Sequence, residues 1–189
     1  MKVILFRGQF LLILLLCLAV KNLSAQQQIP VIKVGTAIEY KFFLYGQTVP
    51  MKLTVKSVQD SVLLDWYIRG ATGSYLIAAA GVEKGTKINF VQPAWKEVLR
   101  LAPDETFAII SRSAFAALQR DKQFVYNQTT YQLKDKKAYQ LGDKKVKVYH
   151  VVGKEEAAEL WILDNPTCPL ICELQNNPLG INFKAIAIN

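Results

Sequence analysis

The chain has 189 residues, of which 23 are basic and 15 acidic, and its formal net charge is +8 with its one histidine neutral. A chain of this length can bury roughly two-thirds of its unfolded surface, which is enough for one self-sufficient domain. The single histidine excludes metal sites that need two imidazole ligands.

Residues 1–25 have the pattern of a secretory signal peptide. Lys2 and Arg7 come first, an apolar run from Phe10 to Val20 follows, and the small residues Ser24 and Ala25 provide a cleavage site. The apolar run is shorter than the roughly 20 residues that cross a bilayer as a helix. We therefore expect export and no transmembrane segment after cleavage.

Cleavage after residue 25 would remove three of the 23 basic residues and no acidic one, so the formal charge would fall from +8 to +5. This modest charge on an exported domain argues against nucleic acid as a partner. The sequence predicts one β-rich domain over residues 26–189, soluble and either periplasmic or associated with the outer envelope.

Alternating apolar residues predict strands in the first half of the domain. Residues 38–44, 51–55 and 62–68 place every second side chain on one face, and Gly46 with Gln47 is expected to turn the first two into a hairpin. Turn residues at 70–73 and 81–85 delimit further strands at 75–80 and 88–91. Residues 93–103 fit a helical turn about as well as a strand, so we expect a packed connection there.

One helix is predicted over residues 111–121, where Ser111 or Ser113 can cap the first amides and Phe115 with Leu118 forms an apolar stripe. Short strands are expected after it, at 124–126, 129–133, 146–152, 160–163, 170–174 and 181–188. The predicted fold is mainly β: a single curled antiparallel sheet of about ten short strands, half-barrel or barrel-like, with one packed α-helix.

Three motifs carry a resemblance to known proteins. They are GTAIEYKFFLYGQ at residues 35–47, ISRSAFAALQR at 110–120 and WILDNPTCPLI at 161–171. Their order resembles a family of uncharacterised exported bacterial β-proteins, and the last motif is similar to the ending of lipoprotein-carrier (LolA-like) half-barrels. The resemblance implies an envelope location and a curved sheet able to hold an apolar ligand, and it brings no catalytic residues.

Cys168 and Cys172, in and beside the late turn, depart from that pattern and are the only cysteines after residue 25. In an extended strand, residues four apart are separated by about 13 Å, well beyond the roughly 4.4–6.8 Å between the Cα atoms of a disulfide. Three alternatives remain open: a disulfide made by folding back at Pro169, two free thiols with Cys172 in the core, or a redox or metal role. The absence of a C-x-x-C motif disfavours the last.

His150 falls by alternation on the apolar face with Val146 and Val148. It is either a hydrogen-bonded core residue or a group that lines a ligand cavity. Six lysines cluster in the predicted hairpin nearby, where they either protect a sheet edge or bind an anionic partner. They are Lys134, Lys136, Lys137, Lys144, Lys145 and Lys147.

These features favour a non-enzymatic envelope protein that binds or shields an apolar ligand such as a lipid. Inward-facing aromatic residues exceed what a thin sheet face needs, and the candidate ligand-lining residues are Tyr40, Phe42, Trp66, Phe90 and His150. The alternative is a structural or protein-interaction module that uses a sheet edge or the lysine-rich hairpin to contact an envelope protein. We predict no catalytic residues, no metal and no cofactor.

Overall fold

The computed structural model describes residues 29–189, and the predicted signal peptide and its cleavage site lie outside the described residues. Within this range the chain forms an 11-stranded sheet and a separate pair of short strands. The first half contains β1 (Ala37–Leu44), β2 (Gln47–Val58), β3 (Val62–Ile68), β4 (Ala71–Ile77), α2 (Ala79–Lys84), β5 (Lys87–Ile88), β6 (Val98–Arg100) and β7 (Glu105–Thr106). The second half contains α3 (Arg112–Asp121), β8 (Gln123–Tyr126), β9 (Thr129–Leu141), β10 (Lys144–Gly153), β11 (Glu159–Leu163), β12 (Ile171–Gln175) and β13 (Ile181–Ile188).

The large sheet has the order β6-β4-β3-β2-β1-β13-β12-β11-β10-β9-β8, so it is open and ends in two short strands. β1 pairs with β13, which joins the first and last strands in the middle of the sheet. All neighbours are antiparallel except β4 and β6, which run parallel. The prediction of a mainly β fold built on one curled sheet is confirmed, in its open form and with a parallel edge strand.

Tight two-residue turns connect several neighbouring strands. Tyr45 and Gly46 have φ angles of 48° and 79°, and Arg69 and Gly70 have 47° and 89°. Positive φ at both turn residues matches the right-handed twist of the flanking strands, and glycine adopts it without a steric penalty. The first hairpin therefore turns one residue earlier than the sequence predicted, at Tyr45-Gly46.

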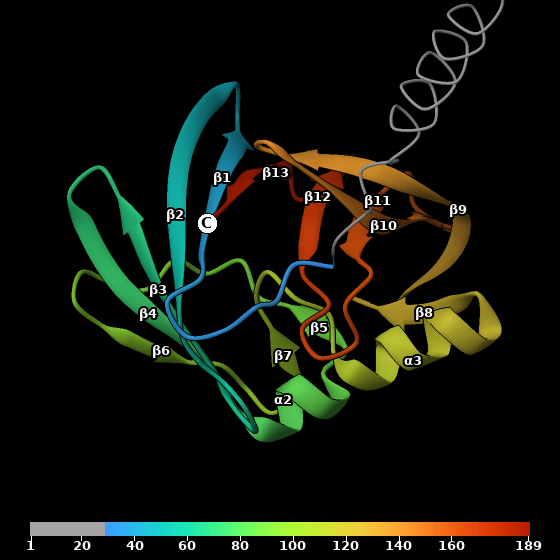
Figure 1. The fold of residues 1–189 in the computed structure, drawn as a ribbon, viewed down its shortest axis with the longest axis horizontal. Coiled ribbons are helices and arrows are strands. Elements are labelled where there is room, and N and C mark those ends of the chain that lie inside the picture. The colour runs from blue at the N-terminus through green and yellow to red at the C-terminus, as the bar shows by residue number, and fades with distance from the viewer. Residues whose placement is uncertain (1–28) are drawn as a thin grey trace, which may run out of the picture.

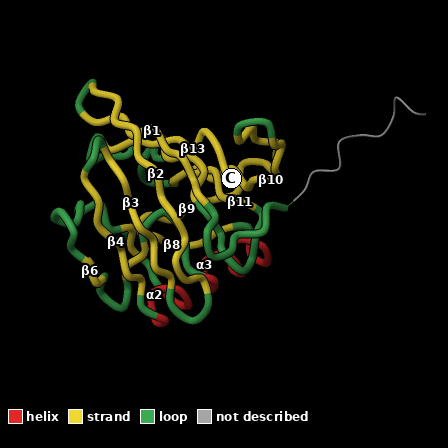
Figure 2. The backbone as a smooth tube through the Cα atoms, turned by 60° about the vertical axis from the view of Figure 1, so that its left-hand side comes forward, coloured by secondary structure: helices red, strands yellow, loops and turns green. Residues whose placement is uncertain are grey.

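The sheet curls around the segment that connects β4 to β8 (Figure 1). Within this segment β5 and β7 lie between the two halves of the curled sheet, and α2 and α3 cross its open side. A second view shows both helices gathered on that same side (Figure 2). We call the face of the sheet that this segment covers the inner face. Contacts such as the stacking of Phe107 on Tyr75, whose ring centroids lie 3.8 Å apart, hold the segment against this face.

The covering segment contains the main differences from the predicted elements. The helix predicted at 111–121 is confirmed as α3, and the Ser111 hydroxyl accepts a hydrogen bond from the Ala114 amide at 3.3 Å. The strand predicted at 75–80 ends at Ile77, and α2 follows it. Its Gly81 packs so closely that a Cβ there would lie 2.5 Å from the Glu105 carbonyl oxygen. The strand predicted at 88–91 is reduced to Lys87–Ile88, because Asn89 turns the chain by accepting the Val91 amide.

The β9–β10 hairpin is longer than predicted, since both strands continue through the lysine-rich stretch. Val148 pairs with Lys137, so Lys137 lies on the face of the buried Val146 and Val148. Lys145 and Lys147 alternate with these valines and are exposed on the opposite face. At its tip the Gly142 amide donates to the Ile186 carbonyl at 2.7 Å, which ties the hairpin to β13.

The hairpin predicted over residues 160–174 forms from β11 and β12. Its loop is held by Asn165, whose Oδ1 accepts the amides of Thr167 and Cys168 at 3.0 and 3.1 Å. The covering segment is hydrogen-bonded to the end of this loop, since the Ile171 amide donates to the Ala108 carbonyl at 2.8 Å. This late hairpin is therefore the anchor for the segment that fills the curled sheet.

Candidate apolar ligand site

An apolar pocket of about 180 Å³ opens at one end of the inner face, and we call it the apolar pocket. Five strands of the large sheet (β1, β2, β3, β4 and β13) and the covering segment contribute its walls. Its lining residues are Phe42, Leu44, Tyr45, Val49, Met51, Ile68, Tyr75, Phe90, Gln92, Phe107 and Ile181. Gln92 is the one side chain among them that carries an amide, so the pocket offers mainly van der Waals contact.

Aromatic rings form the floor of the apolar pocket. The ring centroids of Phe42 and Phe183, on the paired strand β13, lie 5.0 Å apart. Tyr75 stacks on Phe107 with an angle of 16° between the ring planes. Phe42 is 8% exposed and Phe107 3% exposed. The floor therefore consists of two pairs of packed, largely buried rings.

The rim of the apolar pocket is open to solvent. Tyr45, in the β1–β2 turn, is 87% exposed. A Cβ at Gly180, in the β12–β13 turn, would lie 3.7 Å from the Tyr45 ring, which places these two turns side by side. Leu179 and Val91 near this rim are also exposed, so the pocket opens among apolar groups.

A second pocket of about 230 Å³ lies next to the first on the β8–β12 side, and we call it the mixed pocket. Its walls combine apolar and polar side chains. Its lining residues are Ile88, Phe90, Asn127, Tyr131, Glu156, Leu174, Asn177, Pro178 and Leu179. Burial, and then the charge of Glu156, raises the pKa of Tyr131 to about 12, so its hydroxyl is a neutral group at physiological pH.

Two of the five predicted ligand-lining residues, Phe42 and Phe90, line the apolar pocket. Tyr40 lies deeper, 1% exposed, and its hydroxyl donates to the Ile171 carbonyl at 3.0 Å. Trp66 is 2% exposed and packs over Gly73, where a Cβ would lie 2.7 Å from its Nε1. Tyr40 and Trp66 are therefore part of the packed core and not of the wall of the apolar pocket. Trp66 instead borders a separate pocket of about 330 Å³ on the β3–β4 side.

His150 lies on the opposite face of the sheet from the apolar pocket. The pairing of strands places His150 opposite Trp161, Trp161 opposite Glu173 and Glu173 opposite Lys184. The residues next to them in sequence, such as Leu174 opposite Phe183, point to the inner face. The sequence could not show on which face His150 lies, because alternation sorts residues into two faces without indicating which face the covering segment packs against.

Polar partners surround the buried His150 ring. Its Nε2 lies 2.5 Å from a Glu159 oxygen, and its Nδ1 lies 3.3 Å from Lys137 Nζ and 3.5 Å from Asp135. The ring stacks on Trp161 with centroids 4.3 Å apart. Both ring nitrogens have partners and the side chain is 3% exposed, which is the arrangement of a hydrogen-bonded core histidine.

Several pocket residues were missed as site residues, although some had a signal in the sequence. Met51 and Ile68 occupy apolar positions of predicted strands, and Ile181 begins the last one. Phe107 comes from a stretch without periodicity, and only the fold brings it against Tyr75. The alternating pattern could have suggested Met51, Ile68 and Ile181 as pocket residues, but not Phe107.

Both cysteines are free, buried thiols, 4% and 0% exposed at Cys168 and Cys172. Burial raises the pKa of the Cys168 thiol to about 12. Burial, and secondarily the nearby Glu173 carboxylate, raises the pKa of Cys172 further. Since the thiolate is the reactive species, these side chains are poor nucleophiles in the folded protein.

A thiol titration checks this arrangement. In the chain that begins at residue 26, neither cysteine should react with an aromatic disulfide reagent within minutes at pH 8, and both should react after unfolding without reductant. Rapid reaction of the folded protein would contradict the burial of the thiols. Recovery of no thiol after unfolding would show that Cys168 and Cys172 are bridged.

The lysine-rich hairpin has most of its charges engaged locally. Lys134 lies 3.8 Å from Glu159, Lys136 donates to the Tyr149 hydroxyl at 2.8 Å, and Lys144 donates to the Ile188 carbonyl at 2.7 Å. β8 pairs only with residues 129–132 of β9, so the lysines that follow lie along a free strand edge. Edge lysines of this kind oppose pairing with other chains.

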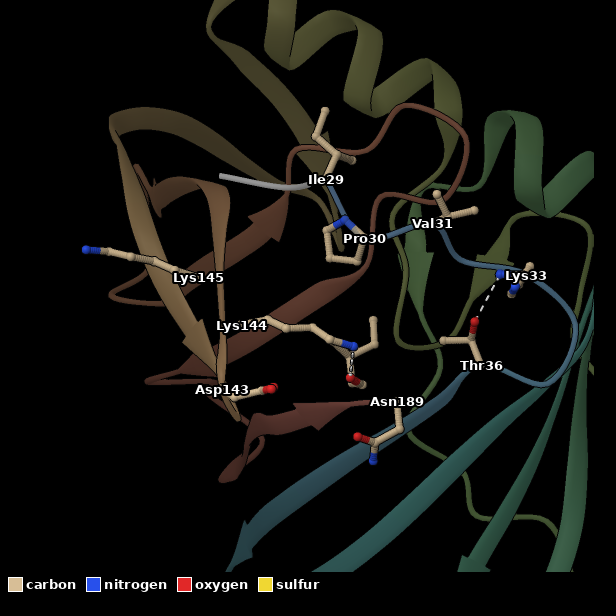
Figure 3. Close-up of a pocket in the computed structure, with 10 residues that line it drawn as sticks. Ile29, Pro30, Val31, Lys33, Thr36, Asp143, Lys144, Lys145 and Asn189 are labelled. Atoms are coloured by element: carbon tan, nitrogen blue, oxygen red, sulfur yellow. Dashed lines mark hydrogen bonds between the residues drawn. The ribbon is translucent and has the colours of Figure 1, made fainter. Parts of the chain in front are cut away.

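A wider pocket of about 650 Å³ lies beside the tip of this hairpin (Figure 3). Residues 29–33 form one wall, and Asp143, Lys144 and Asn189 lie across from them (Figure 3). Lys145 points away from its centre (Figure 3). The one lysine directed across it already donates to the Ile188 carbonyl, so this wide depression offers less defined chemistry than the two pockets at the inner face.

Among residues 29–189, no group of three or more histidine, cysteine or acidic side chains is placed to hold a metal ion. No helix in the same range is long and apolar enough to cross a membrane. Comparisons with protein families, with curated proteins and with solved structures found no match, so the candidate site rests on the geometry of this chain alone.

Proposed function

We propose that this protein is an exported, non-enzymatic envelope protein that binds an apolar ligand such as a lipid at the end of its inner face. The apolar pocket, with its floor of buried aromatic rings and its opening among exposed apolar side chains, is the observation that carries this proposal. The export signal and the resemblance to lipoprotein carriers support it from the sequence.

The chemistry of the pocket suits an alkyl group. Each methylene that leaves water contributes about 0.8 kcal/mol to binding, and a preformed pocket avoids the cost of opening a cavity in the core. Phe42 and Met51 are buried while Val49 and Ile68 are only half-buried, so a ligand would complete the packing of the latter two.

Filling the apolar pocket is expected to weaken binding. Val49 lies opposite Phe42 on the paired strand and lines the pocket, so Val49→Phe would place a ring where the ligand lies. Excluding two methylenes costs about 1.6 kcal/mol, which predicts at least a tenfold loss of affinity for the neutral fluorophore N-phenyl-1-naphthylamine. Fluorescence titration measures this.

Val125→Phe is the matched control, because Val125 on the edge strand β8 is 54% exposed and lines neither pocket of the inner face. It should bind the fluorophore like the unaltered protein. Equal affinities for Val49→Phe and Val125→Phe, with both variants folded, would contradict a ligand site in the apolar pocket.

A second candidate function is an interaction module of the envelope, favoured by the free edge of β9 beyond residue 132. An acidic extended segment of an envelope protein could pair there. Cross-linking in intact cells should then trap one specific partner, and that adduct should disappear when Lys134 and Lys136 on β9 are replaced by glutamate. An unchanged adduct would remove this candidate.

A further inference from the structure

Phe90 is shared by the two pockets of the inner face. The apolar pocket extends from it toward β1–β4, and the mixed pocket extends toward β8, β9 and β12. The side chain is partly buried against the core. A single aromatic side chain therefore lies between the apolar pocket and the mixed pocket.

The backbone that presents Phe90 is fixed on its N-terminal side. The Asn89 amide donates to the Thr106 carbonyl at 2.8 Å, and its side-chain nitrogen donates to Glu105 at 3.0 Å. Its side-chain oxygen accepts the Val91 amide at 2.8 Å. With the main chain held in this way, the Phe90 ring can change rotamer without moving the segment.

The volumes indicate that the pockets act together. Small-molecule sites usually measure about 300–1,000 Å³, and the individual pockets hold about 180 and 230 Å³. Neither reaches that range alone, whereas the joined space does. Phe90 is the one residue common to both linings, so a rotation of its ring is the change we expect to join them.

The two pockets differ in polarity in a way that defines the ligand. The apolar pocket suits an alkyl chain, and the mixed pocket has Asn127, Asn177 and Glu156 in its wall. Glu156 is exposed, so its carboxylate disfavours a negatively charged head group and accepts hydrogen bonds from hydroxyl, amide or ammonium groups.

We propose that Phe90 divides one elongated site, and that the site takes a single-chain amphiphile whose head group is uncharged or cationic. The chain lies in the apolar pocket, passes Phe90, and places the head group beside Glu156 in the mixed pocket. This proposal rests on the proposed function, since it names the ligand class of the same site.

Chain length tests the role of Phe90. For alkyltrimethylammonium probes below their micelle concentration, Phe90→Ala should raise the affinity for the dodecyl chain by about fivefold, and Phe90→Trp should lower it similarly. The hexyl probe, which is too short to need the passage, should bind all three proteins within about twofold. Val125→Ala, at a 54% exposed position of β8 that lines neither pocket, is the matched control. Calorimetric titration gives these values.

The head group tests the role of Glu156. The unaltered protein should bind dodecyltrimethylammonium more tightly than dodecanoate, although the chain carries 23 basic and 15 acidic residues and its overall charge favours the anion. Glu156→Gln should weaken dodecyltrimethylammonium binding about fivefold, the size of one charge contact across about 4 Å in a water-like dielectric, and so reduce this preference. Asp60→Asn removes the same charge from an exposed site elsewhere and should leave the preference unchanged.

The outcomes separate the two proposals. Equal effects of the Phe90 variants on short and long chains would show that Phe90 is only a wall, and a tighter dodecanoate complex would overturn the head-group assignment, while apolar binding itself would stand. If neither the probes nor N-phenyl-1-naphthylamine bound the folded protein, the proposed function would fail as well.

Discussion

Trp66→Ala is expected to lower the free energy of unfolding by about 3–5 kcal/mol, the usual cost of deleting a large buried aromatic side chain. Trp66 is 2% exposed and packs across Gly73 on the neighbouring strand. The glycine has no side chain to collapse into the space, so a cavity would remain. Urea denaturation measures the loss.

Trp66→Phe should be much milder, at about 1.5 kcal/mol or less. The Trp66 indole nitrogen is buried without a hydrogen-bond partner among the described residues, and its replacement removes a group that folding has desolvated without compensation. Both variants should bind the fluorophore normally wherever they are folded. A folded Trp66→Phe with weakened binding would restore Trp66 to the ligand site and contradict its assignment to the core.

Tyr126→Phe is expected to destabilise the protein by about 1–3 kcal/mol, although it deletes a single oxygen atom. The Tyr126 side chain is fully buried, and its hydroxyl contacts the Thr106 hydroxyl and accepts the Ser111 amide, both at 3.0 Å. Ser111 is the residue that caps α3, so the variant would leave a buried amide unpaired at the start of the helix.

Burial raises the pKa of Tyr126, so the hydroxyl remains protonated and able to bridge these groups across the physiological range. Tyr67→Phe is the matched control, because Tyr67 is 52% exposed on β3. Thermal unfolding should separate the two variants by several degrees. Equal midpoints would show that the Tyr126 hydroxyl does not hold the covering segment to β8.

The strands of the sheet were predictable where one face is buried and the other is not. In β1, Ile38, Tyr40 and Phe42 are buried and alternate with more exposed residues, so the pattern in the sequence is the pattern in the fold. In β11, residues 160–163 are buried on both faces, and their location could be predicted but not their orientation. His150 likewise lies in a strand stretch that is buried on both faces, so alternation did not indicate that its side chain points away from the apolar pocket.

The covering segment was harder to predict because long-range contacts determine it. Gly81 is followed by residues that suit a turn, yet its close approach to Glu105 fixes a short helix at this point. Phe107 has no periodic neighbours and is placed by its stack on Tyr75. Phe90 was predicted as a strand residue with an inward ring, and although the strand does not extend to it, the ring does line the inner face.

Native mass spectrometry of the protein released gently from its own envelope tests ligand binding most directly. We predict a bound mass that dissociates as a single-chain amphiphile, is retained in Val125→Phe and is depleted in Val49→Phe. A protein that leaves the envelope without bound ligand, and whose apolar pocket is filled by its own side chains in an experimental structure, would contradict the proposal that this protein binds an apolar ligand.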